Sequence, residues 1–91
     1  MDFKSFKSRE VHNGIQYIHF FPNGYGVSIV RHYLAYASEN TWELAVLVGS
    51  DTAWDLCYTT PITSDVLSEL TDSKVNETCI AISNLNEIVY E

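Results

Sequence analysis

The fold is decided by residues 15–34, which read IQYIHFFPNGYGVSIVRHYL. Two runs rich in β-branched and aromatic residues flank the step Asn23-Gly24, and this arrangement is the strongest short-range signal for a β-hairpin. A type I′ turn requires positive φ at both central residues, a conformation that Asn tolerates and Gly adopts freely. The sequence therefore predicts strands over 15–21 and 25–34, joined by a type I′ turn at Asn23 and Gly24.

The first of these strands is apolar on both faces. Its odd-numbered positions, from Ile15 to Phe21, share one face, and the other face carries Ile18 and Phe20. A strand of this kind belongs in the middle of a sheet, or has one face covered by helices and the other by a partner chain. We therefore expect the hairpin to be a central pair of strands.

Further strands are predicted on both sides of the hairpin. Residues 8–12 precede a second Asn-Gly step and fit a strand, and residues 41–48 have high β-propensity. A short strand is expected over 54–58, with Asp55 facing outward and its apolar neighbours Trp54, Leu56 and Tyr58 facing inward. The first residues, with Phe3 and Phe6, fit either one helical turn or an edge strand.

After Pro61 the apolar period changes from two to 3.6, which predicts helices. Thr63 or Ser64 caps a first helix that runs to about Leu70, and residues 71–73 cap a second over about 74–85. The expected core positions are Ile62, Val66, Leu67 and Leu70 in the first helix, and Val75, Cys79, Ile82 and Leu85 in the second. The predicted fold is α+β: an antiparallel β-meander of about four strands, followed by two C-terminal helices packed on one face, in a single domain over 1–91.

Charge is distributed unevenly along the chain. Twelve acids and five bases give a net charge of −7. Residues 1–31 hold four bases and two acids, a net of +2, whereas residues 32–91 hold ten acids and one base, a net of −9. Such a field repels nucleic acid and anionic membranes and speeds encounter with a basic partner, although it also serves solubility alone. We expect no direct binding to nucleic acid or membrane.

Patterns that carry chemistry are weak in this chain. Ser28, in Gly-Tyr-Gly-Val-Ser, lacks a nucleophile-elbow setting, and no helix follows Gly24-Tyr25-Gly26 to make a phosphate loop. The three histidines, at 12, 19 and 32, have no third ligand at a metal-binding spacing. Cys57 and Cys79 form no CxxC motif and read as buried reduced thiols. We predict that the protein is not an enzyme and uses no cofactor or metal.

Acids and aromatic residues instead suggest a binding surface. On the predicted helical segment, Asp65, Glu69 and Asp72 follow the spacing i, i+4 and i+7 and form one outward row. Seven aromatic residues exceed what so small a core can hide: Tyr17, Tyr25, Tyr33, Tyr36, Trp42, Trp54 and Tyr58. Tyr and Trp are enriched at protein–protein hot spots. The predicted partner-binding residues are Asp65, Glu69, Asp72, Glu77, Glu43 and Asp55.

Three blocks of the sequence resemble a family of small acidic proteins of tailed bacteriophages. They are FPNGYGVSIVRH at 21–32, WELAVL at 42–47 and TPITSDV at 60–66. The resemblance covers about residues 15–70 and carries over no functional residue. It implies a phage accessory protein that acts in the cytoplasm of the infected bacterium, which agrees with an N-terminus that shows no signal peptide.

Two functions of different classes remain open from the sequence. The first is a binding module that engages a host protein with a basic surface, to block a defence or redirect host machinery. A specific version is nucleic-acid mimicry, in which Asp65, Glu69, Asp72 and Glu77 imitate a row of phosphates. The alternative is a homo-oligomeric structural or assembly protein of the phage that has no inhibitory role. Its simplest form is a homodimer in which the sheet packs against that of a second copy.

Overall fold

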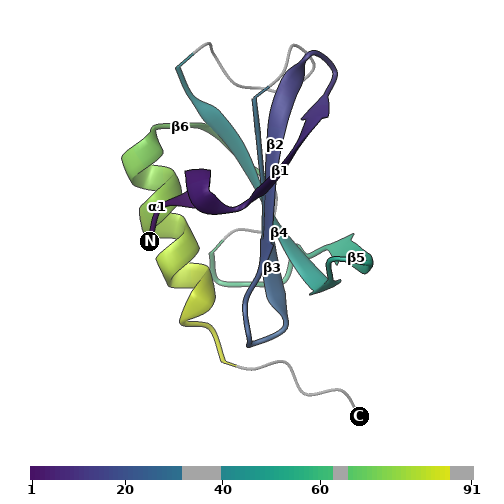
Figure 1. Cartoon of the computed structure of the whole chain (residues 1–91). Coiled ribbons are helices and arrows are strands. Elements are labelled where there is room, and N and C mark those ends of the chain that lie inside the picture. Colours follow the sequence, from purple (N-terminus) through teal and green to yellow (C-terminus); the bar gives the residue numbers. More distant parts are fainter. Residues whose placement is uncertain (32–39, 63–65, 87–91) are drawn as a thin grey trace.

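The computed structural model describes residues 1–31, 40–62 and 66–86. They form a curled antiparallel sheet with a 3₁₀-helix and an α-helix against one face (Figure 1). The strand order is β1-β2-β3-β4-β5, and β6 also pairs with β4. The elements are η1 (Phe3–Ser5), β1 (Lys7–Val11), β2 (Gly14–Phe20), β3 (Tyr25–Arg31), β4 (Trp42–Ser50), β5 (Ala53–Leu56), β6 (Leu67–Leu70) and α1 (Asp72–Ser83).

The predicted meander of about four strands with two C-terminal helices is wrong. Within the described residues the sheet has six strands, and one α-helix follows it. The second predicted helix is present as α1, with Thr71 as its N-cap and with Val75, Cys79 and Ile82 buried as expected. The first predicted helix is not formed in its described part, because Leu67–Leu70 is strand β6; its residues 63–65 lie outside the described residues.

Strand β6 forms because β4 has an edge that β5 does not fill. Strand β5 pairs with positions 47–50 of β4 only, so the backbone of the first half of β4 requires another partner. Strand β6 supplies it through the pairs Trp42↔Leu70 and Leu44↔Leu67, with an irregular register between them. Glu69, at φ 56°, lies inside this irregularity.

The bulge also explains why the sequence suggested a helix. In a regular strand, Leu67 and Leu70 would point to opposite faces, because they are three residues apart. An inserted residue reverses the alternation, and both leucines pack against the same core. The three-residue spacing of the leucines is therefore produced by a β-bulge and not by a helical turn.

The turn between β2 and β3 differs in type from the prediction. Gly24 has φ 88°, but Asn23 is not among the residues with positive φ, so this is not a type I′ turn. The Gly24 N–H donates to Phe21 O at 3.1 Å, and the Phe21 N–H donates to Tyr25 O at 2.8 Å. Pro22 then occupies the second turn position, where its fixed φ is favoured, and Gly24 follows in the left-handed region.

Positive φ at two successive residues occurs instead in the turn between β1 and β2. His12 has φ 46° and Asn13 has φ 61°, one residue before the predicted Asn13-Gly14 step. The hairpin predicted around residues 8–15 is confirmed, with Val11 paired to Gly14.

The side chain of Asn23 joins the hairpin to the end of the helix. Its Nδ2 donates to Ile82 O at 2.9 Å and to Leu85 O at 3.1 Å, while its Oδ1 accepts from the Tyr25 N–H at 3.0 Å. The last carbonyls of an α-helix have no partner within the helix. A buried amide from the turn thus satisfies the C-terminal end of α1 and fixes its position over the sheet.

The core lies between α1 and the helix-facing side of the sheet. At one end, the rings of Phe3, Tyr17 and Trp42 contact one another edge to face, with centroids 5.1 to 5.7 Å apart. The N-terminal residues adopt both of the conformations that the sequence left open, a 3₁₀ turn at η1 and then an edge strand at β1. The buried apolar residues are Phe3, Phe21, Val27, Ile29, Trp42, Leu44, Val46, Leu47, Val75, Cys79 and Ile82.

We predict that Asn23→Ala destabilises the protein by about 1 to 3 kcal/mol, because it removes the three hydrogen bonds of a buried amide and leaves the Leu85 carbonyl without the Asn23 donor. The measurement is urea unfolding followed by tryptophan fluorescence. Asn84→Ala is the matched control, since Asn84 is exposed at the C-cap of α1 and has φ −94°. Equal midpoints for the two variants would show that the Asn23 amide does not hold the helix.

Candidate functional site

The acids predicted to bind a partner do not form one row. Glu69 is exposed on β6, Asp72 begins α1, and Glu77 is exposed further along the helix. The predicted helical row through Glu69 and Asp72 is therefore wrong, because these residues belong to different elements. Asp65 lies outside the described residues. The remaining two acids are distant in sequence: Glu43 is half-buried on β4 and Asp55 is exposed on β5.

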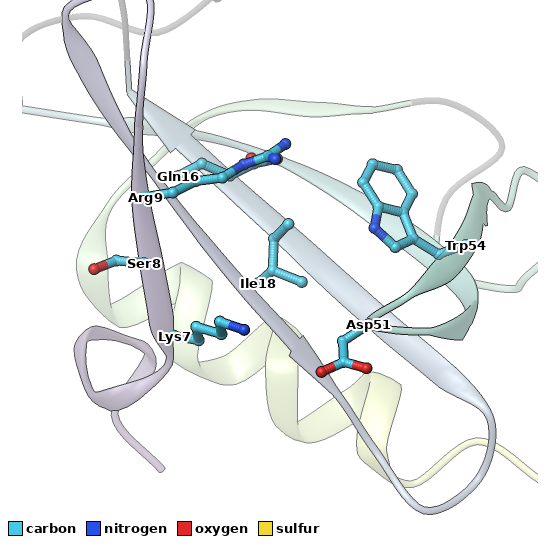
Figure 2. Close-up of a pocket in the computed structure, with 7 residues that line it drawn as sticks. All are labelled: Lys7, Ser8, Arg9, Gln16, Ile18, Asp51 and Trp54. Carbon is cyan, nitrogen blue, oxygen red and sulfur yellow. The ribbon is translucent and has the colours of Figure 1, made fainter.

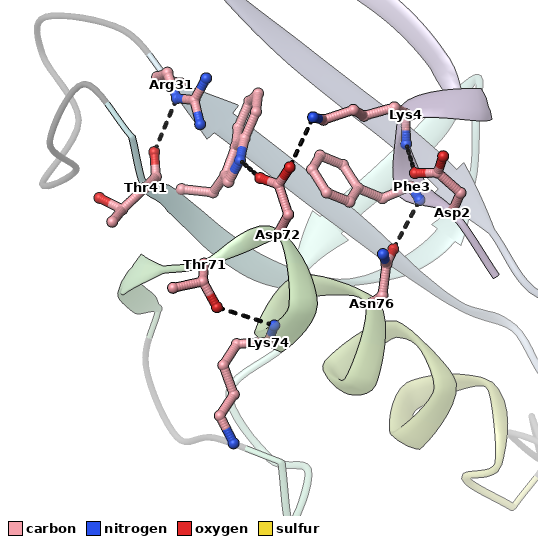
Figure 3. Close-up of polar contacts among 10 residues, drawn as sticks. Asp2, Phe3, Lys4, Arg31, Thr41, Thr71, Asp72, Lys74 and Asn76 are labelled. Atoms are coloured by element: carbon pink, nitrogen blue, oxygen red, sulfur yellow. Dashed lines mark hydrogen bonds and ion pairs between the residues drawn. The ribbon is translucent and has the colours of Figure 1, made fainter.

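Asp72 links the helix to the sheet. Its Oδ1 accepts from the Trp42 indole N–H at 2.8 Å, and its Oδ2 pairs with Lys4 Nζ at 2.7 Å (Figure 3). Arg31 covers the same indole, with its guanidinium carbon 3.7 Å from the ring centroid. The hydrogen bonds from Lys4 and then from Trp42 lower the pKa of Asp72, and the bond to Asp72 raises the pKa of Lys4. This carboxylate is already bound within the protein.

Glu77 is also paired, although weakly. Its Oε2 lies 3.1 Å from Lys74 Nζ, one helical turn earlier, and both side chains are largely exposed. A surface pair of this kind contributes little to stability. Two of the predicted acids therefore have a lysine beside them.

The exposed edge of the sheet at β5 combines an acid with apolar side chains. Asp55 is exposed, and it is followed by Leu56 and Tyr58, which are 45% and 44% exposed. The sequence predicted that both apolar residues face inward, which is wrong; Cys57, between them, is the residue that contacts the core. We refer to Asp55, Leu56 and Tyr58 as the β5 surface. It lies on the opposite side of the molecule from α1 (Figure 1).

A hollow of about 160 Å³ lies on the sheet face opposite the helix, between β1 and the β4–β5 hairpin (Figure 2). Ile18 lies in it between the two cations of β1 and the indole of Trp54. The lining residues are Lys7, Ser8, Arg9, Gln16, Ile18, Asp51 and Trp54. We call it the β1–β5 hollow.

A chain of hydrogen bonds holds one wall of this hollow. The Arg9 Nε–H donates to Gln16 Oε1 at 2.6 Å, and Gln16 Nε2 donates to Ser28 Oγ at 2.7 Å. Gln16 and Ser28 are only 7% and 8% exposed, on strands whose neighbours are mostly apolar. Buried polar groups are tolerated when they are hydrogen-bonded, as these are. The chain fixes the Arg9 side chain against the sheet.

His19 and both cysteines take part in packing. The His19 imidazole stacks on Phe6 with centroids 4.3 Å apart, and His32 lies outside the described residues. Cys79 is buried and Cys57 half-buried, and both are free thiols. Burial raises the pKa of Cys79 to about 12, so this thiol stays protonated and unreactive at neutral pH. Among the described residues, no group of three or more His, Cys, Asp and Glu side chains could hold a metal ion.

Comparisons with protein-family models, with curated proteins and with solved structures give no match for this chain. Within residues 1–31, 40–62 and 66–86, no helix is both long enough and apolar enough to cross a membrane.

Sequence reasoning missed the β1–β5 hollow. Lys7 and Arg9 entered the sequence analysis only through the net charge of residues 1–31, and Trp54 was predicted to face the core. Gln16 was the available signal, because it is a polar residue within a strand that is otherwise mostly apolar. Such a residue requires a partner on the same sheet face, and Arg9 is the residue directly opposite it in the register.

We predict that Asp72→Asn lowers the free energy of unfolding by about 0.5 to 1 kcal/mol near neutral pH, since a carboxylate at a helix N-terminus is lost. The asparagine keeps an acceptor for the Trp42 indole. Because the pKa of Asp72 is lowered in the folded state, its contribution is complete above the unfolded-state value and disappears as pH falls through the folded-state value.

The measurement is urea unfolding of both proteins from pH 7 down to pH 2. The difference between them should vanish at the acid end. Asp55→Asn, on the exposed β5, serves as the control and should show almost no difference at any pH. A constant difference across the whole pH range would contradict the assigned role of the Asp72 charge.

Proposed function

We propose that this protein is a small acidic binding module that recognises a protein partner with a basic surface, through the β5 surface. The supporting observation is that a short edge strand exposes a carboxylate, Asp55, and an apolar side chain, Leu56, at successive positions, and that Tyr58 is exposed just beyond its end. Aromatic and aliphatic groups supply contact energy at an interface, while a charge at its rim sets orientation and association rate. The proposed role is binding, not catalysis.

The charge of the surrounding chain supports a basic partner. No Lys or Arg occurs between positions 51 and 62, where the β5 surface lies, and residues 32–91 carry a net charge of −9. A field of one sign accelerates encounter with a surface of the opposite sign and repels nucleic acid and anionic lipid.

The identity of the partner is proposed from the resemblance to small acidic proteins of tailed bacteriophages. On that basis, the chain acts as an accessory protein in the cytoplasm of the infected bacterium, and its partner is a host protein whose activity it modulates. Nucleic-acid mimicry needs a row of unpaired charges, but Asp72 bonds with Lys4 and Trp42, and Glu77 pairs with Lys74. The proposal therefore rests on the β5 surface.

We predict that Asp55→Lys and Leu56→Ser each reduce capture of the partner at least tenfold, because they remove its charge complementarity and its apolar contact. The measurement is affinity capture from bacterial lysate at low and at high salt, quantified by mass spectrometry. A true partner should be captured by the wild type, lost at high salt, and depleted by both substitutions.

Two substitutions on α1 provide matched controls. Glu77→Lys makes the same charge change as Asp55→Lys, and Ile80→Ser removes an apolar side chain that is 44% exposed, close to the 45% of Leu56. Both control variants should capture the partner as well as the wild type does. Loss with Glu77→Lys but not with Asp55→Lys would overturn the β5 surface and favour mimicry. Light scattering that gives a dimer disrupted by Leu56→Ser would instead favour the homo-oligomeric alternative.

A further inference from the structure

The β1–β5 hollow shares no lining residue with the β5 surface and has a different chemical character. It gathers two cations, Lys7 and Arg9, and one carboxylate, Asp51, and so has a net positive charge in a protein whose net charge is −7. Figure 2 shows the Arg9 guanidinium extending over Gln16 toward the indole of Trp54. A positive site in a negative protein is selective, because anions are repelled from the rest of the surface.

Arg9 is prepared to receive an anion. Its Nε is bonded to Gln16, which leaves its two terminal nitrogens without a partner among the described residues. A guanidinium held in one orientation loses little side-chain entropy when it binds, and its planar fork matches a carboxylate or a phosphate. Gln16 accepts the hydrogen bond from Arg9 and is itself held by its buried bond to Ser28, and the two bonds together preorganise the guanidinium.

Lys7 adds a second positive charge on the same face of β1. It is two residues before Arg9, so both side chains lie on one side of the strand. Lys7 is exposed, and its Nζ has no hydrogen bond or ion pair with another described residue. Its ammonium is therefore available to a ligand, whereas Lys4 is occupied by Asp72 and Arg31 by Trp42.

The remaining walls of the hollow fit a flat ring. Trp54 is half-buried and presents its indole opposite the cations, and Ile18 lies between them. A cavity of about 150 Å³ holds one benzene ring, and this hollow has about 160 Å³. Aromatic rings stack on an indole in offset or edge-on geometry, with an energy beyond that of simple burial.

A second hollow of about 340 Å³ continues the first along β2. Both are lined by Lys7, Ile18 and Asp51, and the second adds residues of β2 and of the end of β4. A ligand larger than one ring can therefore extend past Lys7. The Asp51 carboxylate at this junction can accept a hydrogen bond from a ligand hydroxyl or amine.

We propose that the β1–β5 hollow binds a small ligand in which a flat ring carries an oxyanion, with the ring against Trp54 and the oxyanion on Arg9 and Lys7. Two sources share this chemistry, a nucleoside monophosphate and an aromatic carboxylate. A single-stranded nucleic acid would present the same groups, but its many phosphates would face the acidic remainder of the surface.

The test is isothermal titration of the full chain with five probes: adenosine 5′-monophosphate, benzoate, adenosine, inorganic phosphate and a single-stranded oligonucleotide. Adenosine 5′-monophosphate or benzoate should bind at least tenfold more tightly than adenosine or phosphate, which each lack one of the two groups. Tighter binding of adenosine 5′-monophosphate would identify the ligand as a nucleoside monophosphate, and tighter binding of benzoate would identify it as an aromatic carboxylate. Absence of binding by both, or equal binding of inorganic phosphate alone, would overturn the proposal, as would tighter binding of a single-stranded oligonucleotide.

Variants then locate the site. Arg9→Gln and Trp54→Leu should each weaken the better probe at least tenfold, and Gln16→Leu should weaken it less, since Gln16 only positions Arg9. Lys74→Gln removes an exposed cation on α1 and should leave the affinity unchanged. Two-dimensional amide NMR spectra, recorded for each variant without probe, confirm that the fold is kept. Unchanged affinity in both Arg9→Gln and Trp54→Leu, with the fold intact, would place binding elsewhere and overturn the proposal.

Discussion

The amide of Asn23 is the contact on which the arrangement of helix and sheet depends. It bonds simultaneously to its own hairpin, through Tyr25, and to the C-terminal end of α1, through the carbonyls of Ile82 and of Leu85, which lies just beyond the helix. The other end of α1 is held by the Thr71 cap and by the bond from Trp42 to Asp72. Because both ends are fixed, one face of the sheet is committed to the core, and the opposite face and β5 remain available for ligands.

The local features of the fold were predictable, and the non-local ones were not. Residues 15–34 predicted the central hairpin, and the period of Val75, Cys79 and Ile82 predicted α1, because each signal lies within one element. Strand β6 was missed because its existence depends on the length of β5, which leaves half of β4 unpaired. The bulge at Glu69 then gives its leucines a helical spacing. The turn type was missed because Pro22 favours a different turn from the one that Asn-Gly suggests.

In the candidate site, too, the local feature was predictable from the sequence and the non-local one was not. Asp55 was predicted as a partner-binding residue from its outward position on a strand, and it is exposed. The β1–β5 hollow required knowledge of the sheet curl, which brings Arg9 of β1 and Trp54 of β5 to one concavity although three strands lie between them. Strand twist and curl arise from the whole sheet, and no short pattern in the sequence encodes them.

The position of β5 means that the two proposed sites share one structural element. Trp54 and Asp55 are successive residues of a four-residue strand, so their side chains point to opposite faces. A ring stacked on Trp54 would restrain the strand that presents Asp55 and Leu56 to a protein partner. Once the ligand has ordered this short edge strand, a protein partner that binds β5 loses less conformational entropy. By thermodynamic linkage, the partner raises the affinity for the ligand by the same factor. A small anionic ligand and a basic protein would then favour each other's binding without touching.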